Sequence, residues 1–132
     1  MKVITFIVGV FFAAHAFALQ YQYECTVKSE LALDSEGYLK AYPIPVEVGS
    51  VFSVDRVSGK IIGKPFTNIR ADSVRVLDEG SSEQSFKVLS LSMALKGEYN
   101  TGFLIIDEFQ KAEYKPFVGQ DGTSTIYSGL CK

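Results

Sequence analysis

The chain of 132 residues contains one histidine, two cysteines and no tryptophan. Its histidine, His15, lies within residues 1–18, which have the pattern of a secretory signal peptide, so the predicted mature chain has no histidine. Imidazole is the usual acid or base at neutral pH and activates most nucleophiles. We therefore expect a protein that is not an enzyme and has no catalytic residues.

The first 18 residues are predicted to direct export. Lys2 provides a positive start, the 12 residues from Val3 to Ala14 form an apolar stretch, and small residues recur up to Ala18. This stretch is shorter than the ~20 residues that a permanent membrane helix needs, and no second apolar run of that length follows. We expect cleavage after Ala18 and no stable membrane insertion afterwards. The protein should be secreted or periplasmic, and the absence of an Asn-x-Ser/Thr sequon favours a bacterial periplasm.

The predicted mature chain is slightly acidic. Loss of Lys2 from the 13 basic residues leaves 12 against 15 acidic ones, with the two signs interspersed. Nucleic-acid binding would call for a concentrated basic face, so we expect no nucleic-acid partner. Residues 19–132 are enough for a single hydrophobic core. We predict one domain over 19–132, present as a monomer.

Two cysteines near the ends of the mature chain predict a disulfide. Cys25 and Cys131 would both enter an oxidising compartment, where a bridge between them is the simplest outcome. A catalytic thiol or a metal site would need a partner base or further ligands, and the chain offers no mature histidine and no third cysteine. A bridge that closes a loop of about 100 residues would stabilise the fold by ~4.7 kcal/mol in the chain-entropy model.

Short strands separated by turn signals run along the body of the chain. Tyr23, Cys25 and Val27 alternate with polar residues, which predicts a half-buried strand with Cys25 facing inward. Val51 to Arg56 is predicted to form a hairpin with Ile61-Ile62 through a two-residue turn at Ser58-Gly59. Further strands are expected at 73–78, 85–93, 102–109, 114–118 and 124–131.

Two regions do not fit a strand pattern. Pro43 and Pro45 remove two backbone donors, which predicts a sheet edge or a crossing loop. Residues 64–72 are expected to form a loop or one short helical turn. About eight short strands with tight turns predict an all-β fold, a small antiparallel meander barrel, with a β-sandwich as the alternative. A Cys25–Cys131 bridge would place the first and last strands side by side.

Acidic residues give no clear catalytic or metal site. Asp107 and Glu108 would point to opposite faces if they lie on a strand, so they could not share a substrate. Asp34, Glu36 and Gly37 offer too few oxygen ligands for a calcium loop and are better explained as a hairpin turn. We therefore expect no metal and no cofactor.

Aromatic side chains are the positive feature of the composition. Seven tyrosines and six of the ten phenylalanines lie beyond residue 18. Most are expected to fill the core, but tyrosines could also form a binding surface because each combines a rigid apolar ring with a polar tip. The candidate surface residues are Tyr38, Tyr42, Tyr99 and Tyr114. The expected partner is an unknown protein or a small apolar ligand.

The sequence Tyr23-Glu24-Cys25 near the mature start, together with a cysteine near the end, resembles the small periplasmic inhibitors of C-type lysozymes. This resemblance implies an exported β-barrel with a protein partner. It covers only the two ends, the chain has no tryptophan, and Ser58-Gly59-Lys60-Ile61 does not continue the family's loop pattern. The resemblance is therefore one of architecture, and it assigns no site residues.

Taken together, these features predict a non-catalytic binding or interaction module that works in the periplasm or outside the cell. The alternatives are a structural or envelope-maintenance protein, a periplasmic inhibitor of a hydrolase, and a histidine-free hydrolase that uses carboxylates or a serine–lysine pair.

Overall fold

The computed structural model describes residues 21–93 and 97–132, so the predicted signal peptide lies outside the described residues. The described residues form nine strands and no helix. The strands are β1 (Gln22–Leu33), β2 (Leu39–Ala41), β3 (Val51–Asp55), β4 (Ile61–Ile62), β5 (Ser73–Glu79), β6 (Phe86–Met93), β7 (Tyr99–Ile106), β8 (Lys115–Gln120) and β9 (Thr125–Cys131). No helix within 21–93 and 97–132 has the length and apolar character needed to cross a membrane.

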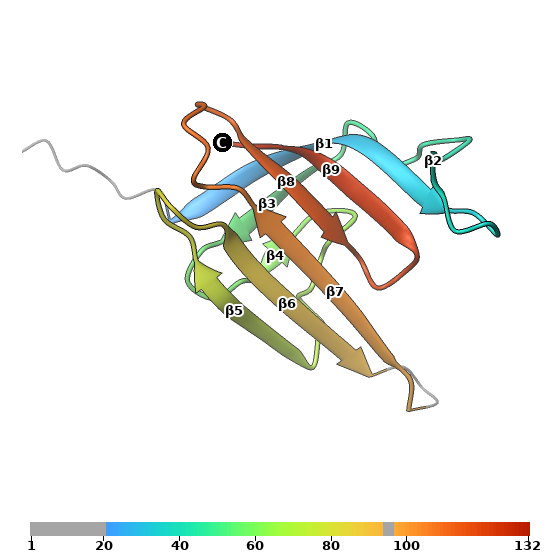
Figure 1. Cartoon of the computed structure of the whole chain (residues 1–132). Helices are drawn as coiled ribbons and strands as arrows, with labels where there is room; N and C mark the ends of the chain where they lie inside the picture. Colours follow the sequence, from blue (N-terminus) through green and yellow to red (C-terminus); the bar gives the residue numbers. More distant parts are fainter. Residues whose placement is uncertain (1–20, 94–96) are drawn as a thin grey trace, which may run out of the picture.

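All nine strands belong to one antiparallel sheet that curls into a half-barrel (Figure 1). The strand order is β4-β3-β1-β9-β8-β7-β6-β5, and β2 pairs with the far half of β1. Strands β5 to β9 form a meander, and β1 then lies beside β9. The predicted antiparallel meander with adjacent first and last strands is confirmed.

Three predicted details of the strands are wrong. β2 was not expected, and β7 begins at Tyr99 and ends at Ile106 where the sequence predicted 102–109. The β3–β4 turn is longer than two residues, because the Asp55 N–H donates to the Lys60 carbonyl across the loop. The Asp55 carboxylate causes this wider turn, since its Oδ1 accepts the N–H groups of Val57 and Ser58.

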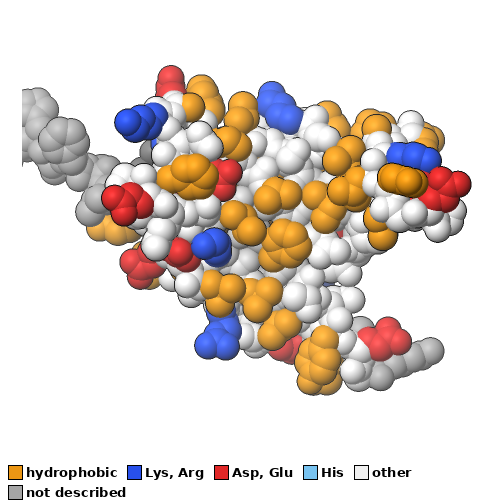
Figure 2. Space-filling view, in the orientation of Figure 1, with side chains coloured by type: hydrophobic (Ala, Val, Ile, Leu, Met, Phe, Trp, Pro, Cys, Tyr) orange, Lys and Arg blue, Asp and Glu red, His pale blue; other side chains and the backbone are white. Residues whose placement is uncertain are grey.

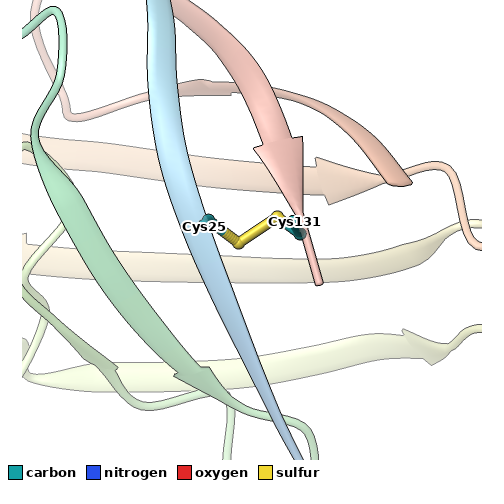
Figure 3. The surroundings of a disulfide bond; sticks show 2 residues. All are labelled: Cys25 and Cys131. Carbon is teal, nitrogen blue, oxygen red and sulfur yellow. A yellow bond between two sulfur atoms is a disulfide. The ribbon is translucent and has the colours of Figure 1, made fainter. Parts of the chain in front are cut away.

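The disulfide joins the neighbouring strands β1 and β9 within the sheet (Figure 3). Cys25 on β1 and Cys131 on β9 are direct cross-strand partners with an S–S distance of 2.02 Å, and both are fully buried. The neighbouring pair, Glu24 and Lys132, exchanges both backbone hydrogen bonds, at 3.0 and 2.9 Å. The cysteines therefore occupy a non-hydrogen-bonded position, where cross-strand side chains lie closest together. The predicted disulfide and the inward direction of Cys25 are confirmed.

A β-bulge in β1 changes which residues face the core. Tyr23, Cys25 and Val27 are buried as the alternation predicts, but the pairing with β9 shifts between Val27 and Ser29. The extra residue reverses the phase, so Glu30 turns inward and is only 7 % exposed. Its Oε2 accepts the Glu47 N–H at 3.0 Å, which fixes the loop after β2.

Six of the fourteen buried hydrophobic residues are aromatic, but six further aromatic residues are exposed, so the rings fill the core only in part. Phe52 packs edge-on against Phe66 and Phe117, with centroid distances of 5.0 and 5.2 Å, and Phe66 packs edge-on against Tyr127 at 5.4 Å. These four residues, which we call the aromatic cluster, are each at most 5 % exposed. Edge-to-face pairs of this kind contribute ~0.5–1.5 kcal/mol beyond their burial.

The position of Tyr127 leads to an alkaline pH dependence. Burial, followed by the nearby carboxylates of Asp121, Glu30 and Glu47, raises the pKa of Tyr127 from 10.0 to about 12. The unfolded state loses this proton first as the pH rises, so stability should fall between pH 10 and 12. Urea unfolding across this range should show a smaller fall for Tyr127→Phe than for the wild type. Equal slopes for the two proteins would contradict this assignment.

Candidate functional site

The structure contains a cavity of about 260 Å³ between the loop 63–72 and the inner side of β6, β7 and β8. Its wall includes apolar side chains from the core and a larger number of polar ones. The lining residues are Ile61, Pro65, Phe66, Thr67, Asn68, Arg70, Ala71, Val88, Ser90, Ser92, Asn100, Gly102, Phe103, Leu104, Gln120 and Asp121. We call this space the loop cavity.

The loop cavity is apolar at its base and polar toward its opening. Phe66, Val88 and Leu104 are buried core residues, whereas Ser92 is half-buried and Asn100 is exposed. An apolar base with a few polar groups is typical of small-molecule sites. The volume lies just below the roughly 300–1,000 Å³ of such sites, so the cavity suits a small occupant.

Asn68 holds the loop that forms one wall of the cavity. Its Oδ1 accepts the Ile61 N–H at 2.7 Å, and its Nδ2 donates to the Gly59 carbonyl and to Ser90 Oγ, both at 3.0 Å. The Asn68 N–H also donates to the Ile61 carbonyl. Asn68 therefore acts as a pairing partner for the two-residue strand β4 and connects it to β6. Since its amide is fully used within the protein, it is a positioning residue.

Replacing Asn68 with alanine should destabilise the fold by about 2–3 kcal/mol, because the buried N–H of Ile61 and the carbonyl of Gly59 lose their side-chain partner. Urea unfolding measures the loss. Asn100→Ala provides the matched control, because Asn100 is exposed and should change stability by less than about 0.5 kcal/mol. Similar values for the two variants would show that Asn68 does not hold the loop.

The polar groups that face the loop cavity differ in how many bonds they already make. The Asp121 carboxylate is occupied on both oxygens, because Oδ1 accepts from the Thr123 N–H and hydroxyl and Oδ2 lies 3.4 Å from the Tyr127 hydroxyl. In contrast, Arg70 forms no ion pair within the described part of the chain. The charged donor at the opening is thus the less satisfied group.

A second charged hollow, of about 220 Å³, lies near the disulfide. Arg56 Nη2 donates to Glu108 Oε2 at 3.0 Å and to the Glu79 carbonyl at 3.3 Å, and its guanidinium lies 4.9 Å from the centre of the Tyr23 ring. Burial raises the pKa of Glu108, and the charge of Lys115 opposes that shift. These contacts join the ends of β3, β5 and β7, which gives Arg56 a structural role.

The adjacent carboxylates Asp107 and Glu108 follow β7 and do not lie on it, so the predicted reason for their separation is wrong. Asp107 accepts a hydrogen bond from Ser85, whereas Glu108 faces Arg56. The two carboxylates therefore contact different partners, although not for the reason that the sequence predicted. At the hairpin between β1 and β2, Asp34 Oδ1 accepts the N–H groups of Glu36 and Tyr38, which forms the turn that the sequence predicted there.

The four candidate tyrosines lie on three separate segments of the chain. Tyr38 and Tyr42 belong to the β1–β2 hairpin and the residues after it, Tyr99 begins β7, and Tyr114 precedes β8. All four are exposed, between 40 and 68 %, and none is among the residues that line the loop cavity. The Lys132 amine lies over the Tyr114 ring, 5.8 Å from the centre of that ring.

Apolar side chains also cross the outer face of the sheet. Leu89, Phe103, Ile126 and Leu31 occupy one cross-strand row over β6 to β1, interrupted on β8 by Gln120. We call these four apolar residues the outer strip. All four are half-buried, although they lie on the opposite face from the core row of Val88 and Leu104. Figure 2 shows hydrophobic side chains gathered on this face.

Sequence reasoning missed the loop cavity because its two sides come from distant segments. Residues 64–72 were expected to form a loop or one short helical turn, and the structure shows a loop. Their pattern does not indicate that Arg70 borders a cavity. The one available signal is Phe66 itself, a large apolar side chain in a loop that is otherwise mostly polar. In comparisons with known proteins, no family model matches the chain, and no curated protein or solved structure shows significant similarity to it.

Proposed function

We propose that this protein is a non-catalytic binding module of the periplasm or cell exterior, and that the loop cavity is its ligand site. The observation that carries this proposal is the cavity's composition, an apolar base of core residues beneath an opening lined by side-chain donors and acceptors. The disulfide is compatible with an oxidising compartment.

The arrangement of the site also supports binding without catalysis. Asn68, the buried polar residue of the lining, is occupied by bonds to the backbone and to Ser90, so it shapes the wall and offers no free base or nucleophile. The guanidinium of Arg70 has donors and no acceptor, so it is unsuited to act as a general base. Such groups can orient a ligand but are poorly suited to proton transfer.

Native mass spectrometry of the protein isolated from its source organism tests this proposal. We expect a co-purifying molecule of small mass, and we expect Ser92→Leu, which fills the opening from β6, to remove it. Ser128→Leu on the outer side of β9 is the control, since Ser128 is not a lining residue, and should retain the molecule. Repeated recovery of the bare wild-type protein would count against a ligand site.

A protein-binding module is the second candidate, and the outer strip favours it. Half-buried apolar residues occupy four of the five strands from β6 to β1 on the face opposite the core, where a sheet in contact with water usually carries polar side chains. A photo-crosslinking amino acid at Leu89 should then capture one defined protein in the source organism. The same probe at exposed Lys60, on the β3–β4 turn, should capture none.

A further inference from the structure

The loop cavity has an unequal supply of hydrogen-bonding groups. Its one lining carboxylate, Asp121, already accepts from Thr123 and lies against Tyr127. Among the other lining residues, the guanidinium of Arg70 can only donate, whereas the hydroxyl of Ser92 and the amide of Asn100 can each donate or accept. None of these three side chains makes a hydrogen bond within residues 21–93 and 97–132. An occupant rich in acceptors would complement this opening.

The charge of Arg70, which is unpaired in the part of the chain that the structure describes, also favours an acceptor-rich ligand, in particular a carboxylate. Each of the four ion pairs in the described residues lies elsewhere, and Arg70 takes part in none of them. A guanidinium presents five donors in a planar fork that matches a carboxylate in a bidentate manner. Because Asp121 is engaged in its own turn, Arg70 carries the cationic charge at the opening without a carboxylate committed to it.

The base of the cavity determines which kind of chemical group the buried end of the ligand can carry. Phe66, Val88 and Leu104 are at most 5 % exposed and offer only aromatic and aliphatic surface. A polar group placed there would lose its hydration without gaining a partner. The limited volume of about 260 Å³ excludes long chains. A compact apolar body is therefore the part that would fit beneath the loop 63–72.

Resting on the proposed ligand site, we infer that its ligands are small carboxylates with a short apolar or aromatic body, held by Arg70 at the opening. The carboxylate would accept from the guanidinium, with Asn100 or Ser92 as a second donor. The apolar body would pack against Phe66 and Leu104. Recognition would combine one charge-assisted contact with burial of a small hydrophobic group.

An isosteric series tests this inference. Titration of the full mature protein with phenylacetate, phenylacetamide and phenethylamine, followed by ligand-observed NMR, compares the same apolar body with an anionic, a neutral and a cationic head. We expect phenylacetate to bind about tenfold more tightly than the amide, because hydrogen bonds to charged groups are roughly twice as strong as neutral ones. The amine should bind weakest, since it would face the guanidinium.

Two arginine variants test whether the preference for the acid comes from Arg70 at the cavity or from positive charge elsewhere on the protein surface. Arg70→Gln should remove the preference for the acid over the amide, whereas Arg75→Gln should leave it intact, because Arg75 is an exposed residue of β5 outside the cavity lining. Both positions are exposed, so both variants should fold, and circular dichroism checks this. Increasing salt should weaken phenylacetate binding to the wild type more than to Arg70→Gln.

The outcomes distinguish the inference from the proposed function. Equal binding of the acid and the amide to the wild type, abolished by Ser92→Leu, would overturn carboxylate recognition and leave a ligand site in the loop cavity. An acid preference that survives in Arg70→Gln would also overturn it. If no probe of the series binds the wild type, both the inference and the ligand site are overturned for molecules of this size.

Discussion

Removal of the disulfide is expected to lower the free energy of unfolding by about 2–5 kcal/mol. Cys25 and Cys131 are separated by 106 positions, so their bridge constrains nearly the whole described chain when it unfolds. Alanine is the appropriate replacement at both positions, because the two sulfur atoms are fully buried and a serine hydroxyl there would lose its hydration. Urea unfolding of the wild type, the reduced wild type and the double variant Cys25→Ala/Cys131→Ala measures the effect.

The loss of stability without the disulfide should be greatest in the part of the sheet next to the bridge. Pairing of β1 and β9 extends from Cys25–Cys131 to Ala32–Thr125, so the sheet should remain formed at its far end. The hydrogen bonds between Glu24 and Lys132, next to the bridge, should open first. Hydrogen exchange should therefore accelerate at these two amides more than at Leu31. An unfolding midpoint that does not change would contradict the stabilising role of the bridge.

Local alternation was enough to predict much of the fold. The pattern of Tyr23, Cys25 and Val27 predicted both the first strand and its buried face, because a period of two has only one arrangement on a half-buried strand. The bulge after Val27 could not be predicted in this way. It depends on the pairing with β9, more than ninety residues further along the chain, and it turns Glu30 inward against the simple pattern.

Two of the missed details, β2 and the start of β7, share a cause. The three residues of β2 are all exposed, and β7 begins with the exposed residues Tyr99, Asn100 and Thr101, so neither segment shows a hydrophobic face. Their strand geometry comes from pairing with β1 and β6. Tertiary context, not intrinsic preference, determines such strands.

The loop cavity illustrates the same limit for the site. Each of its walls looks unremarkable in sequence: a polar loop at 63–72 and two ordinary strands, β6 and β7. The wall exists because Asn68 provides β4 with a partner and because Phe66 inserts into the core from the loop. Gly119 permits this insertion, since an added Cβ would lie 2.7 Å from the Phe66 ring and 2.8 Å from the Phe103 carbonyl. Contacts of this kind have no signature within a single segment.

Phe66 connects the core to the site, and its replacement with alanine is expected to reduce stability by about 3–5 kcal/mol. Its ring lies 5.0 Å from Phe52, 6.0 Å from Phe117 and 5.4 Å from Tyr127, so its removal leaves a void in the aromatic cluster. The same change enlarges the base of the loop cavity. Urea unfolding should show the loss, and the binding of any cavity ligand should weaken because a principal apolar contact is gone.

Phe109→Ala is the control, because Phe109 is 40 % exposed and belongs to the turn after β7, outside the aromatic cluster. It should change stability by less than about 1 kcal/mol. Phe66→Leu separates the two roles of the ring, since leucine fills part of the void and should recover part of the stability without restoring edge-to-face contacts. If Phe66→Ala were as stable as Phe109→Ala, the loop 63–72 would not be anchored in the core, and the loop cavity would lose the wall on which its proposed function depends.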